Sequence, residues 1–459
     1  MPARRSPALR ASLTTLTALL ALAALLVAQR SDPASLRLSA TTTNRVTPGD
    51  FRGYGFDQCS APSQAAMDTW MRTSPFLAVG IYISGNSRAC RSQPNLTPGW
   101  VSAQLAAGWK LLPITLGPQA ACNPRYPRYS KSIDPTINPS TTSSYAAART
   151  QGRAEAAKTA DAATALGITK GSTLWYDLES FDTSRTACRE SALSFLSDYT
   201  RVLHQRGYVS GVYSSAGSGI AMLDQVRAER PTAYTLPDAI WLARWDDQAN
   251  TSTTYIPDTG WNPGRRVKQY QGGHNETWGR VTINIDRDFL DLGRGAYAAP
   301  DRPCAAVRVN FTTYPALTTA NASSYPLQVK ALQCLLHVAG YYAGQLNGTY
   351  NNATIAGVQH WAADHGVALV ADGRTSRSVW VALLAAGSHP ILKTGSAGSD
   401  VRRLQRALDA AVPGANVRVT GIYDAATSSA MHTYQSVVGL PHTANLTDGT
   451  WTRLMRGQW

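Results

Sequence analysis

Eight short apolar runs between residues 50 and 295 constrain the fold of this chain most strongly. The runs are RGYGFDQC, LAVGIYISG, WKLLPITLG, STLWYDLES, GYVSGVYSS, DAIWLARWD, RVKQYQGG and TINIDRDF. The segments between several of them are amphipathic or rich in alanine, at 64–72, 98–107, 145–166 and 189–206. Eight strands that mostly alternate with helices in about 245 residues match the size of a (β/α)8 barrel. The sequence therefore predicts an α/β fold, a TIM barrel over residues 50–295. No helix is obvious after the sixth run, so we expect the last turns of the barrel to be irregular.

An internal repeat follows the barrel segment. VKALQCLL at 329–336 recurs as VRRLQRAL at 401–408, and GTY at 348–350 recurs as GIY at 421–423. A period of about 72 residues suits one small helical unit per repeat. We predict two small all-α three-helix modules, over residues 304–387 and 391–459, after a linker at 293–303. The aromatic residues at matching positions are expected in the module cores: Trp361, Trp380, Tyr434 and Trp451.

The first thirty residues have the pattern of a targeting segment. MPARRSPALR is basic, and residues 13–28 form an uninterrupted run without charge. Sixteen residues are short for a membrane span, which needs ~20. We therefore expect residues 1–30 to be a signal peptide, with an uncleaved membrane anchor as the alternative.

Export explains the cysteine content. The six cysteines are Cys59, Cys90, Cys122, Cys188, Cys304 and Cys334. An even number in an exported chain favours three disulfides, because the compartment is oxidising. The sequence contains no CxxC pair, and its eight His show no ligand spacing with Cys or Glu, so we expect no structural metal site.

The positive charge of the chain is diffuse. The formal net charge is +14, but no run of Lys and Arg resembles a nucleic-acid-binding arm. We therefore expect no nucleic-acid partner. A diffuse positive field suits an anionic polymer such as a cell wall.

Acidic residues fall at the ends of the predicted strands. Asp177 and Glu179 end the fourth run, and residues two apart in a strand point to the same side. In a TIM barrel the carboxyl ends of the strands form the rim that holds the active site. Asp57 ends the first run, and Asp286 lies on the eighth together with Asp288. We expect Asp57, Asp177, Glu179 and Asp286 to converge on one pocket.

Such a cluster suits glycosidic cleavage. Like charges a few ångströms apart raise one pKa, so one carboxyl keeps its proton near neutrality beside a carboxylate. Other polar and aromatic residues on the runs are expected to bind a sugar: Tyr82, Tyr213, Trp241, Arg244 and Gln269. The alternative is a set of solvated or ion-paired strand-end acids with Arg244 as partner. A Ser/His/Asp triad is disfavoured, since no G-x-S-x-G elbow occurs. We expect no cofactor, although Mg²⁺ or Ca²⁺ at the rim acids remains an alternative.

The ordered segments GYGFD, GIYISG, WYDLES, GVYSS, IWLARWD, KQYQGG and NIDRD resemble a known family. It is the secreted glycoside-hydrolase-like barrel of actinobacterial proteins, which is similar to the lysozyme-type muramidases of glycoside hydrolase family 25. The resemblance implies that Glu179 is the proton donor and that Asp177 stabilises positive charge on the sugar or its N-acetyl group. It also implies that Asp57 and Asp286 line the sugar subsite and position or activate water.

The cysteines depart from the muramidase pattern, since the first four each follow one of the first four runs. We expect the pairs Cys59–Cys90 and Cys122–Cys188 to pin neighbouring rim loops, and Cys304 to pair with Cys334. The two C-terminal repeats resemble small three-helix peptidoglycan-binding modules. The matching pieces are VKALQCLL, GTYNNATIAGVQHW and DGRTSRSVW in the first, and VRRLQRAL, GIYDAATSSAMHTYQ and DGTW in the second.

Together these features predict a secreted, wall-associated glycoside hydrolase that cleaves β-1,4 bonds of peptidoglycan or a related wall glycan. Two alternatives stay open: a barrel that binds glycan without cutting it, and an amidase or peptidase that acts on stem peptides. A membrane contact is expected only through an uncleaved N-terminal segment.

Overall fold

A computed structural model describes residues 44–301, 304, 307–369 and 374–459 of the chain. The expected signal peptide or anchor at residues 1–30 lies outside the described residues. Within the part that is described, none of the helices is both long and apolar enough to cross a membrane.

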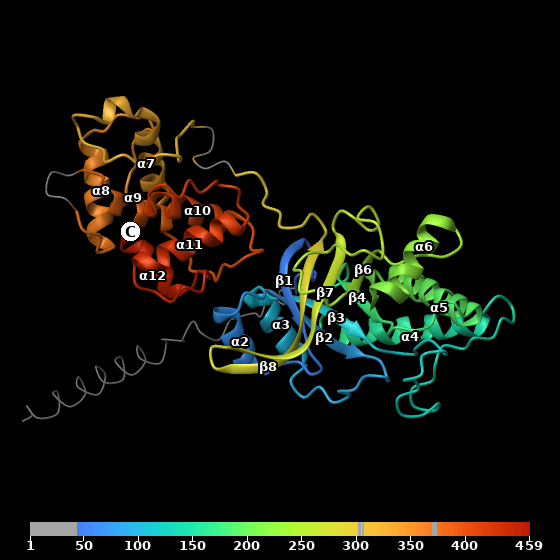
Figure 1. Cartoon of the computed structure of the whole chain (residues 1–459). Helices are drawn as coiled ribbons and strands as arrows, with labels where there is room; N and C mark the ends of the chain where they lie inside the picture. Colours follow the sequence, from blue (N-terminus) through green and yellow to red (C-terminus); the bar gives the residue numbers. More distant parts are fainter. Residues whose placement is uncertain (1–43, 302–303, 305–306, 370–373) are drawn as a thin grey trace, which may run out of the picture. The chain divides into compact units, whose positions relative to one another are not determined.

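Eight strands form a closed barrel in chain order, from β1 round to β8 (Figure 1). Neighbouring strands from β1 to β7 are parallel, and the closed eight-stranded barrel predicted from the sequence is confirmed. The strands are β1 (Phe51–Asp57), β2 (Ala78–Ser84), β3 (Lys110–Thr115), β4 (Thr173–Asp177), β5 (Val209–Ser215), β6 (Ala239–Ala243), β7 (Arg265–Trp278) and β8 (Val281–Leu292).

Helices connect the first six strands. They are α2 (Gln64–Thr73), α3 (Pro98–Ala107), α4 (Ala146–Ala165), α5 (Thr186–Gln205) and α6 (Ala221–Glu229), with a π-turn, η3 (Ala216–Ile220), before α6. Two of these helices, α2 and α3, begin at a side chain that caps the helix N-terminus. The Ser63 side chain accepts a hydrogen bond from the Ala66 N–H, and Thr97 caps α3 just before Pro98, which is favourable at a first helical position. The long helices α4 and α5 lie side by side (Figure 1).

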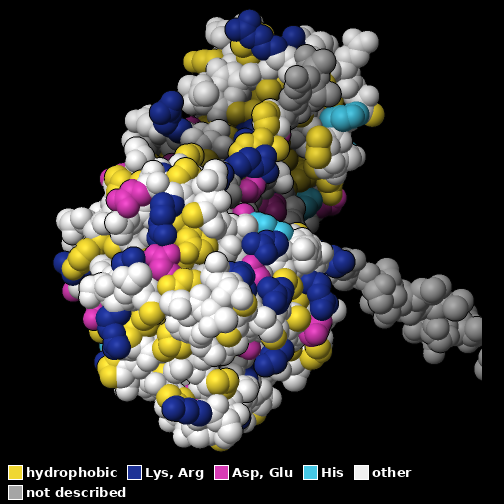
Figure 2. Space-filling model, turned by 90° about the vertical axis from the view of Figure 1, so that its right-hand side faces the viewer, with side chains coloured by type: hydrophobic (Ala, Val, Ile, Leu, Met, Phe, Trp, Pro, Cys, Tyr) yellow, Lys and Arg dark blue, Asp and Glu magenta, His cyan; other side chains and the backbone are white. Residues whose placement is uncertain are grey.

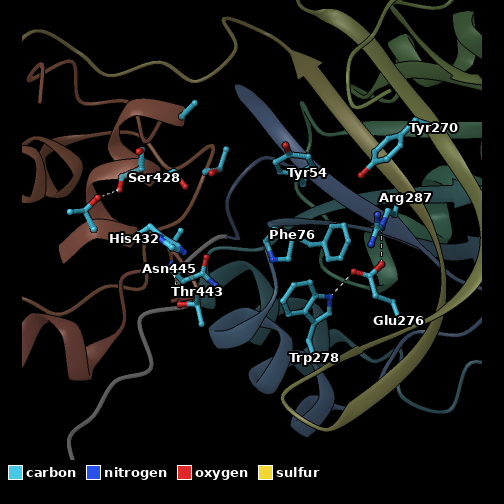
Figure 3. A pocket seen from close by; sticks show the side chains of 16 residues that line it. Tyr54, Phe76, Tyr270, Glu276, Trp278, Arg287, Ser428, His432, Thr443 and Asn445 are labelled. Carbon is cyan, nitrogen blue, oxygen red and sulfur yellow. Dashed lines mark hydrogen bonds and ion pairs between the residues drawn. The ribbon is translucent and has the colours of Figure 1, made fainter. Parts of the chain in front are cut away.

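The last two strands depart from a regular (β/α)8 pattern. Between Trp278 and Val281 only two residues connect β7 to β8, and the two strands pair antiparallel. A parallel pair needs a crossover of about a dozen residues or more. A connection of two residues is therefore possible only in an antiparallel hairpin. Glu276 braces this hairpin by accepting hydrogen bonds from Arg287 Nε (2.8 Å) and Trp278 Nε1 (2.7 Å) (Figure 3). The irregular end expected of the barrel is therefore a β-hairpin.

Glycine makes room for tryptophan inside the barrel. Trp175 on β4 and Trp241 on β6 are buried and meet edge to face, with ring centroids 5.6 Å apart. An added Cβ at Gly211 on β5 would lie 2.3 Å from the Trp175 ring, and one at Gly80 on β2 would lie 3.2 Å from the Trp241 ring. Glycine on β5, next to β4, and on β2, across the barrel from β6, therefore leaves the space that the two indoles occupy.

Three disulfides pair as expected from the sequence: Cys59–Cys90, Cys122–Cys188 and Cys304–Cys334. The first two join loops that follow β1 and β2, and the loop after β3 to the start of α5. They therefore fix loops that leave the carboxyl ends of the strands.

The C-terminal part contains two copies of a three-helix unit. The first holds α7 (Pro326–Val338), α8 (Asn352–Asp364) and α9 (Arg377–Ala385), preceded by a short 3₁₀ turn, η4 (Ala322–Ser324). The second holds α10 (Ser399–Ala411), α11 (Ala425–Val437) and α12 (Asp448–Met455). The predicted all-α architecture after the barrel is confirmed.

A buried glutamine organises each copy in the same way. Gln333 Nε2 donates to Thr354 Oγ1 (3.1 Å), and Gln405 Nε2 donates to Thr427 Oγ1 (3.0 Å). The oxygen of each glutamine accepts from the backbone of a glycine 15 or 16 residues later. Since both copies share this network, the sequence repeat is also a structural repeat. The four aromatic residues expected in the cores are all at most 1% exposed: Trp361, Trp380, Tyr434 and Trp451.

The two copies pack on each other and on the barrel. Val381 and Leu384 of α9 belong to the hydrophobic core of the second copy. Lys393 is fully buried, and its Nζ donates to the carbonyl oxygens of Ser74 and Phe76, 3.0 Å away in each case. The ammonium group thus satisfies carbonyls that follow the end of α2.

The positive side chains are dispersed on the face of the molecule shown in Figure 2. Lys and Arg lie there among hydrophobic, acidic and uncharged side chains. This face therefore carries no continuous basic patch.

Candidate active site

Strand geometry brings the predicted acids together at the rim of the barrel. Asp57 and Asp177 are the last residues of β1 and β4. Asp286 pairs directly with Asp57 across the β1–β8 ladder, so the two side chains share a face. Glu179 stands two residues beyond Asp177, and it lines one cavity together with Asp57 and Asp286. Three of the four acids expected in one pocket, Asp57, Glu179 and Asp286, therefore line one cavity, whereas Asp177 lies buried beside them and does not line it.

Asp286 reaches the rim for a reason that the sequence analysis did not foresee. In a parallel barrel a rim residue lies at the end of its strand, whereas Asp286 lies in the middle of β8. Because β8 runs antiparallel to β1 and β7, its first residues lie in the hairpin beyond the rim. The strand reaches the level of the rim at Asp286 and then continues towards the opposite end of the barrel.

A fifth carboxyl group lies below the four. Asp288 is completely buried two residues along β8, and one of its oxygens accepts a hydrogen bond from Trp241 Nε1 at 3.0 Å. No donor among the described residues reaches its other oxygen. The sequence analysis noted Asp288 on this strand but did not place it in the cluster. The period-two rule puts it on the same face as Asp286 and could have included it.

Burial favours the neutral form of the three deepest acids. The pKa values of Asp57, Asp177 and Asp288 lie well above their usual range, chiefly because burial removes the water that would stabilise a carboxylate. The next cause is a neighbouring negative charge, from Asp286 on Asp57, from Glu179 on Asp177 and from Asp57 on Asp288. These acids therefore tend to hold protons.

The two acids nearer the surface are perturbed less. Burial raises the pKa of Asp286 to about 6, although the charge of His274 opposes the shift. Burial also raises the pKa of Glu179, while Arg125 and Arg128 lower it. A partly exposed carboxyl with a raised pKa is suited to donate a proton near neutrality.

Hydrogen bonds fix the turn that carries the central pair. Gln119 Nε2 donates to the backbone oxygen of Asp177 (2.7 Å), and its oxygen accepts from the N–H of Glu179 (2.8 Å). Tyr82 donates its hydroxyl to Asp177 Oδ2 at 3.2 Å. Asp177 Oδ1 is buried and has no hydrogen-bond partner among the described residues.

Gln269 belongs to the support of the site rather than to its ligand-binding surface. It is 3% exposed, and its Nε2 donates to Asp57 Oδ2 at 2.9 Å. Its oxygen accepts from Tyr213 and from Trp245 Nε1, both at 3.0 Å. The expectation that Gln269 binds substrate is therefore corrected, because its amide positions Asp57.

Trp241 also differs from its expected role. Its indole is 1% exposed, packed between Trp175 and Tyr213, and therefore offers no face to a sugar. The accessible indole of this region is Trp245, which is 64% exposed and follows β6. Arg244 forms no ion pair with a described acid and instead lies over the ring of Tyr255, which argues against the ion-paired alternative.

Two cavities meet at Glu179. One, of about 210 Å³, is lined by Asp57, Tyr82, Arg88, Arg128, Asn284 and Asp286, and the Cys59–Cys90 disulfide forms part of its wall. The other, of about 360 Å³, is lined by Tyr213, Arg244, Trp245 and Tyr255. Glu179 borders both. An extended ligand that occupies the two cavities would therefore pass directly over this carboxyl group.

A larger cavity of about 660 Å³ lies elsewhere. Tyr54, Tyr270 and Trp278 of the barrel line it, together with Ser428 and His432 of α11 (Figure 3). None of the rim acids borders it. We therefore assign the candidate site to the two smaller cavities.

Residues 68–290 match the model of the Rv2525c-like, glycoside hydrolase-like domain. The barrel is therefore similar to this family. The second helical copy also has a match, because residues 397–454 fit the putative peptidoglycan binding domain. The Rv2525c-like barrel is therefore followed by a helical region with a peptidoglycan-binding domain, as the resemblance implied.

Solved structures similar to the Rv2525c-like barrel are distant in sequence. One is an uncharacterized protein of B. stearothermophilus, with 15% identity and a TM-score of 0.34, covering 52% of this chain and 95% of that one. Another is the Tat-secreted protein Rv2525c of Mycobacterium tuberculosis in complex with L-tartrate. Its identity is 13% and its TM-score 0.35, covering 53% of this chain and 97% of that one. None of the curated proteins matches the chain.

Proposed function

We propose that this protein is a secreted, wall-associated glycoside hydrolase that cleaves β-1,4 bonds of peptidoglycan or a related wall glycan. One observation carries the proposal: Glu179, a partly exposed acid with a raised pKa, stands between two cavities. A glycosidic oxygen over Glu179 would have one sugar on either side. A family relationship alone would not suffice, since one fold hosts many functions.

In the proposed reaction the Glu179 carboxyl gives its proton to the glycosidic oxygen. The C1–O bond breaks, and its electron pair stays on the departing oxygen. Water then adds to C1, and its second proton returns to a carboxylate, so that the net change is the addition of one water. Asp57 and Asp286, which pair across β1 and β8, would position or activate this water.

Asp177 would assist from beneath the sugar. Its Oδ2 accepts the Tyr82 hydroxyl, and its Oδ1 lacks a donor within the described structure. The N–H of an N-acetyl group would supply that donor. A hydrogen bond to the carboxylate favours its charged form, so substrate would lower the raised pKa of Asp177 and let it stabilise positive charge.

The rest of the chain supports action at the wall. Three disulfides are typical of an oxidising compartment, and the second helical copy matches a peptidoglycan-binding domain. The first copy shares its glutamine network, so we assign it the same role. Two weak sites on one chain retain an enzyme on a polymer, because the second contact is intramolecular.

Reducing-sugar release from purified cell wall tests the proposal. We expect release by the wild type and a loss of about 10²–10⁴-fold in Glu179→Gln, the usual contribution of a general acid. Glu229→Gln is a matched control on α6, and we expect it to keep wild-type activity. Equal, negligible release by wild type and Glu179→Gln would reject hydrolysis.

A non-catalytic glycan-binding protein is the second candidate. The burial of Asp57 and Asp177 favours it, because an assisting acid that stays protonated cannot stabilise a cationic sugar. Sedimentation with purified wall separates the two, since a binding protein would sediment with wall without releasing sugar. Mass spectrometry of soluble products tests the amidase alternative, which predicts free stem peptides in place of muropeptides.

A further inference from the structure

The cavity of about 210 Å³ contains positive charge that the proposed reaction does not use. Arg88, from the loop after β2, and Arg128, from the loop after β3, line it beside Glu179 and Asp286. These two guanidinium groups need an explanation, because the charge of Arg128 lowers the pKa of Glu179 and so opposes its protonation.

Arg88 is held firmly. Its Nε donates to the Gly85 oxygen (2.8 Å) and its Nη1 to the Tyr82 oxygen (3.1 Å). Its own backbone oxygen accepts the Tyr129 hydroxyl at 2.6 Å, and Cys90 of the Cys59–Cys90 disulfide lies two residues further on. Two of its five N–H groups are thus used on carbonyls, and three remain.

Arg128 comes from a turn that Asp134 organises. The Asp134 carboxylate accepts the backbone N–H groups of Arg128, Tyr129 and Ser130. The guanidinium donates one hydrogen bond, from Nη2 to the Tyr126 hydroxyl at 3.0 Å. The backbone of the loop is therefore fixed, whereas most donors of the guanidinium are unused.

Neither guanidinium is held in an ion pair with a described acid, although the charge of Glu155 acts on Arg88 and the charge of Arg128 acts on Glu179. Across the described residues, no ion pair joins Arg88 or Arg128 to a carboxylate, although acids share the cavity. The deepest of these acids favour their neutral forms, so they do not cancel the positive charge. Planar guanidinium groups bind carboxylates through paired hydrogen bonds, and an Arg pair beside a sugar cavity is suited to this.

We propose that this cavity takes a sugar residue that carries a carboxylate, and that Arg88 and Arg128 bind this group. The inference rests on the proposed function only in that it treats the cleft as a glycan site, and it names the substrate class. A uronic acid within a polysaccharide and a muramic acid with a free lactyl group both supply the required carboxylate.

Binding by calorimetry tests the inference, in a Glu179→Gln background that keeps the ligands intact. The first probe is a tetrasaccharide of N-acetylglucosamine and N-acetylmuramic acid with free lactyl carboxylates, and its reference is the same molecule with methyl-amidated lactyl groups. A glucuronic-acid tetramer and chitotetraose form the second pair. We expect at least one carboxylated probe to bind at least tenfold more tightly than its neutral reference, and the pair that shows this identifies the source.

Substitution of the arginines should remove that preference. In Arg88→Gln and in Arg128→Gln we expect the ratio of the affinity for the carboxylated probe to that for its neutral reference to fall below about threefold, because affinity for the carboxylated probe decreases more. Because Arg128 is exposed, we expect Arg128→Gln to fold normally. If Arg88→Gln folds poorly, Arg128→Gln alone tests the inference. Arg91→Gln is the control, because Arg91 lies over the Tyr129 ring and does not line the cavity. We expect Arg91→Gln to prefer the carboxylated probe over its neutral reference as strongly as the parent protein does.

The outcomes separate the inference from the proposed function. Tight binding of neutral probes with no preference for carboxylates would overturn the inference and leave the glycan site standing. An equal loss for neutral and carboxylated probes in Arg128→Gln would also overturn it, since the arginine would then support the cavity as a whole and would not bind the carboxylate. No binding of any probe would overturn both.

Discussion

Replacement of Gly211 by alanine tests how the barrel interior supports the site. Gly211 lies on β5 opposite Trp175 on β4, and an added Cβ would lie 2.3 Å from one Trp175 ring atom and 2.6 Å from two others. Ordinary contacts of a Cβ begin near 3.4 Å, so the overlap is about 1 Å. Trp175 is fully buried against Trp241 and cannot swing away without moving it.

The magnitude follows from this lack of room. One extra methyl group in a packed core costs about 1–3 kcal/mol, and the rigid indole places Gly211→Ala near the upper end. For a barrel of about 245 residues, roughly 2–4 °C of melting temperature correspond to each kcal/mol, so we expect a decrease of about 4–12 °C. The same shift would disturb the hydrogen bond from Trp241 to Asp288 beneath the acids.

Calorimetry and urea unfolding of the full chain measure the effect. Gly99→Ala is the matched control within the same barrel, because its Cβ would have a single neighbour at 3.8 Å in the first turn of α3. We expect that variant to be as stable as the wild type or slightly more so. A Gly211→Ala melting temperature within 1 °C of wild type would refute the packing of the two tryptophans described above.

Three further predictions concern buried polar groups. The free energy of unfolding of Asp286→Asn should rise by about 1–2 kcal/mol relative to wild type between pH 4 and pH 7, because the raised pKa of Asp286, about 6 in place of 3.8, makes its ionisation in the folded state unfavourable. The pKa difference corresponds to ~3 kcal/mol, and screening by solvent reduces this figure. A difference in urea unfolding that does not depend on pH would contradict this prediction. The free energy of unfolding of Gln269→Leu should be about 2–4 kcal/mol lower than that of wild type, since three hydrogen bonds are lost and Asp57 is left buried without one of them. An unchanged unfolding midpoint would show that these bonds contribute nothing. Burial lowers the pKa of Lys393 to about 7, so its charged form is penalised at low pH and the penalty fades as pH rises through 7. The stability of wild type relative to Lys393→Met should therefore increase between pH 6 and pH 9, and a decrease would contradict the burial of the amine.

Alternation of strands and helices made the barrel predictable. The apolar run before Asp177 ends where β4 ends, and strand periodicity then placed Glu179 on the same side of the sheet. The repeat was equally informative, because a duplicated pattern such as VKALQCLL and VRRLQRAL keeps its core positions in both copies. Both predictions rest on local regularity, which a sequence displays directly.

The direction of β8 and the role of Trp241 could not be obtained in this way. The two-residue turn Gly279-Arg280, in which both residues have positive φ, is typical of a hairpin, but the sequence analysis did not use it. Trp241 was assigned to the sugar because of its residue type, whereas its exposure depends on Gly80 and Trp175 from other strands. Contacts between elements decide which aromatic ring faces solvent.

The loop residues were missed for a different reason. Arg88 and Arg128 lie in irregular segments, and no periodic pattern marks their positions. Their approach to Glu179 depends on the Cys59–Cys90 disulfide and on the turn around Asp134. Such cross-links act over distance, so the sequence shows their components and not the arrangement.

The reversed eighth strand also determines where the chain leaves the barrel. Leu292 pairs with Phe51, the first residue of β1, so the polypeptide exits at the end of the barrel opposite the acids. A parallel last strand would have ended at the mouth of the cleft and needed a helix to bring the chain back. Here the segment that leads to the helical copies starts at the end of the barrel opposite the candidate site, so its first residues do not crowd the rim where Asp57 and Glu179 lie.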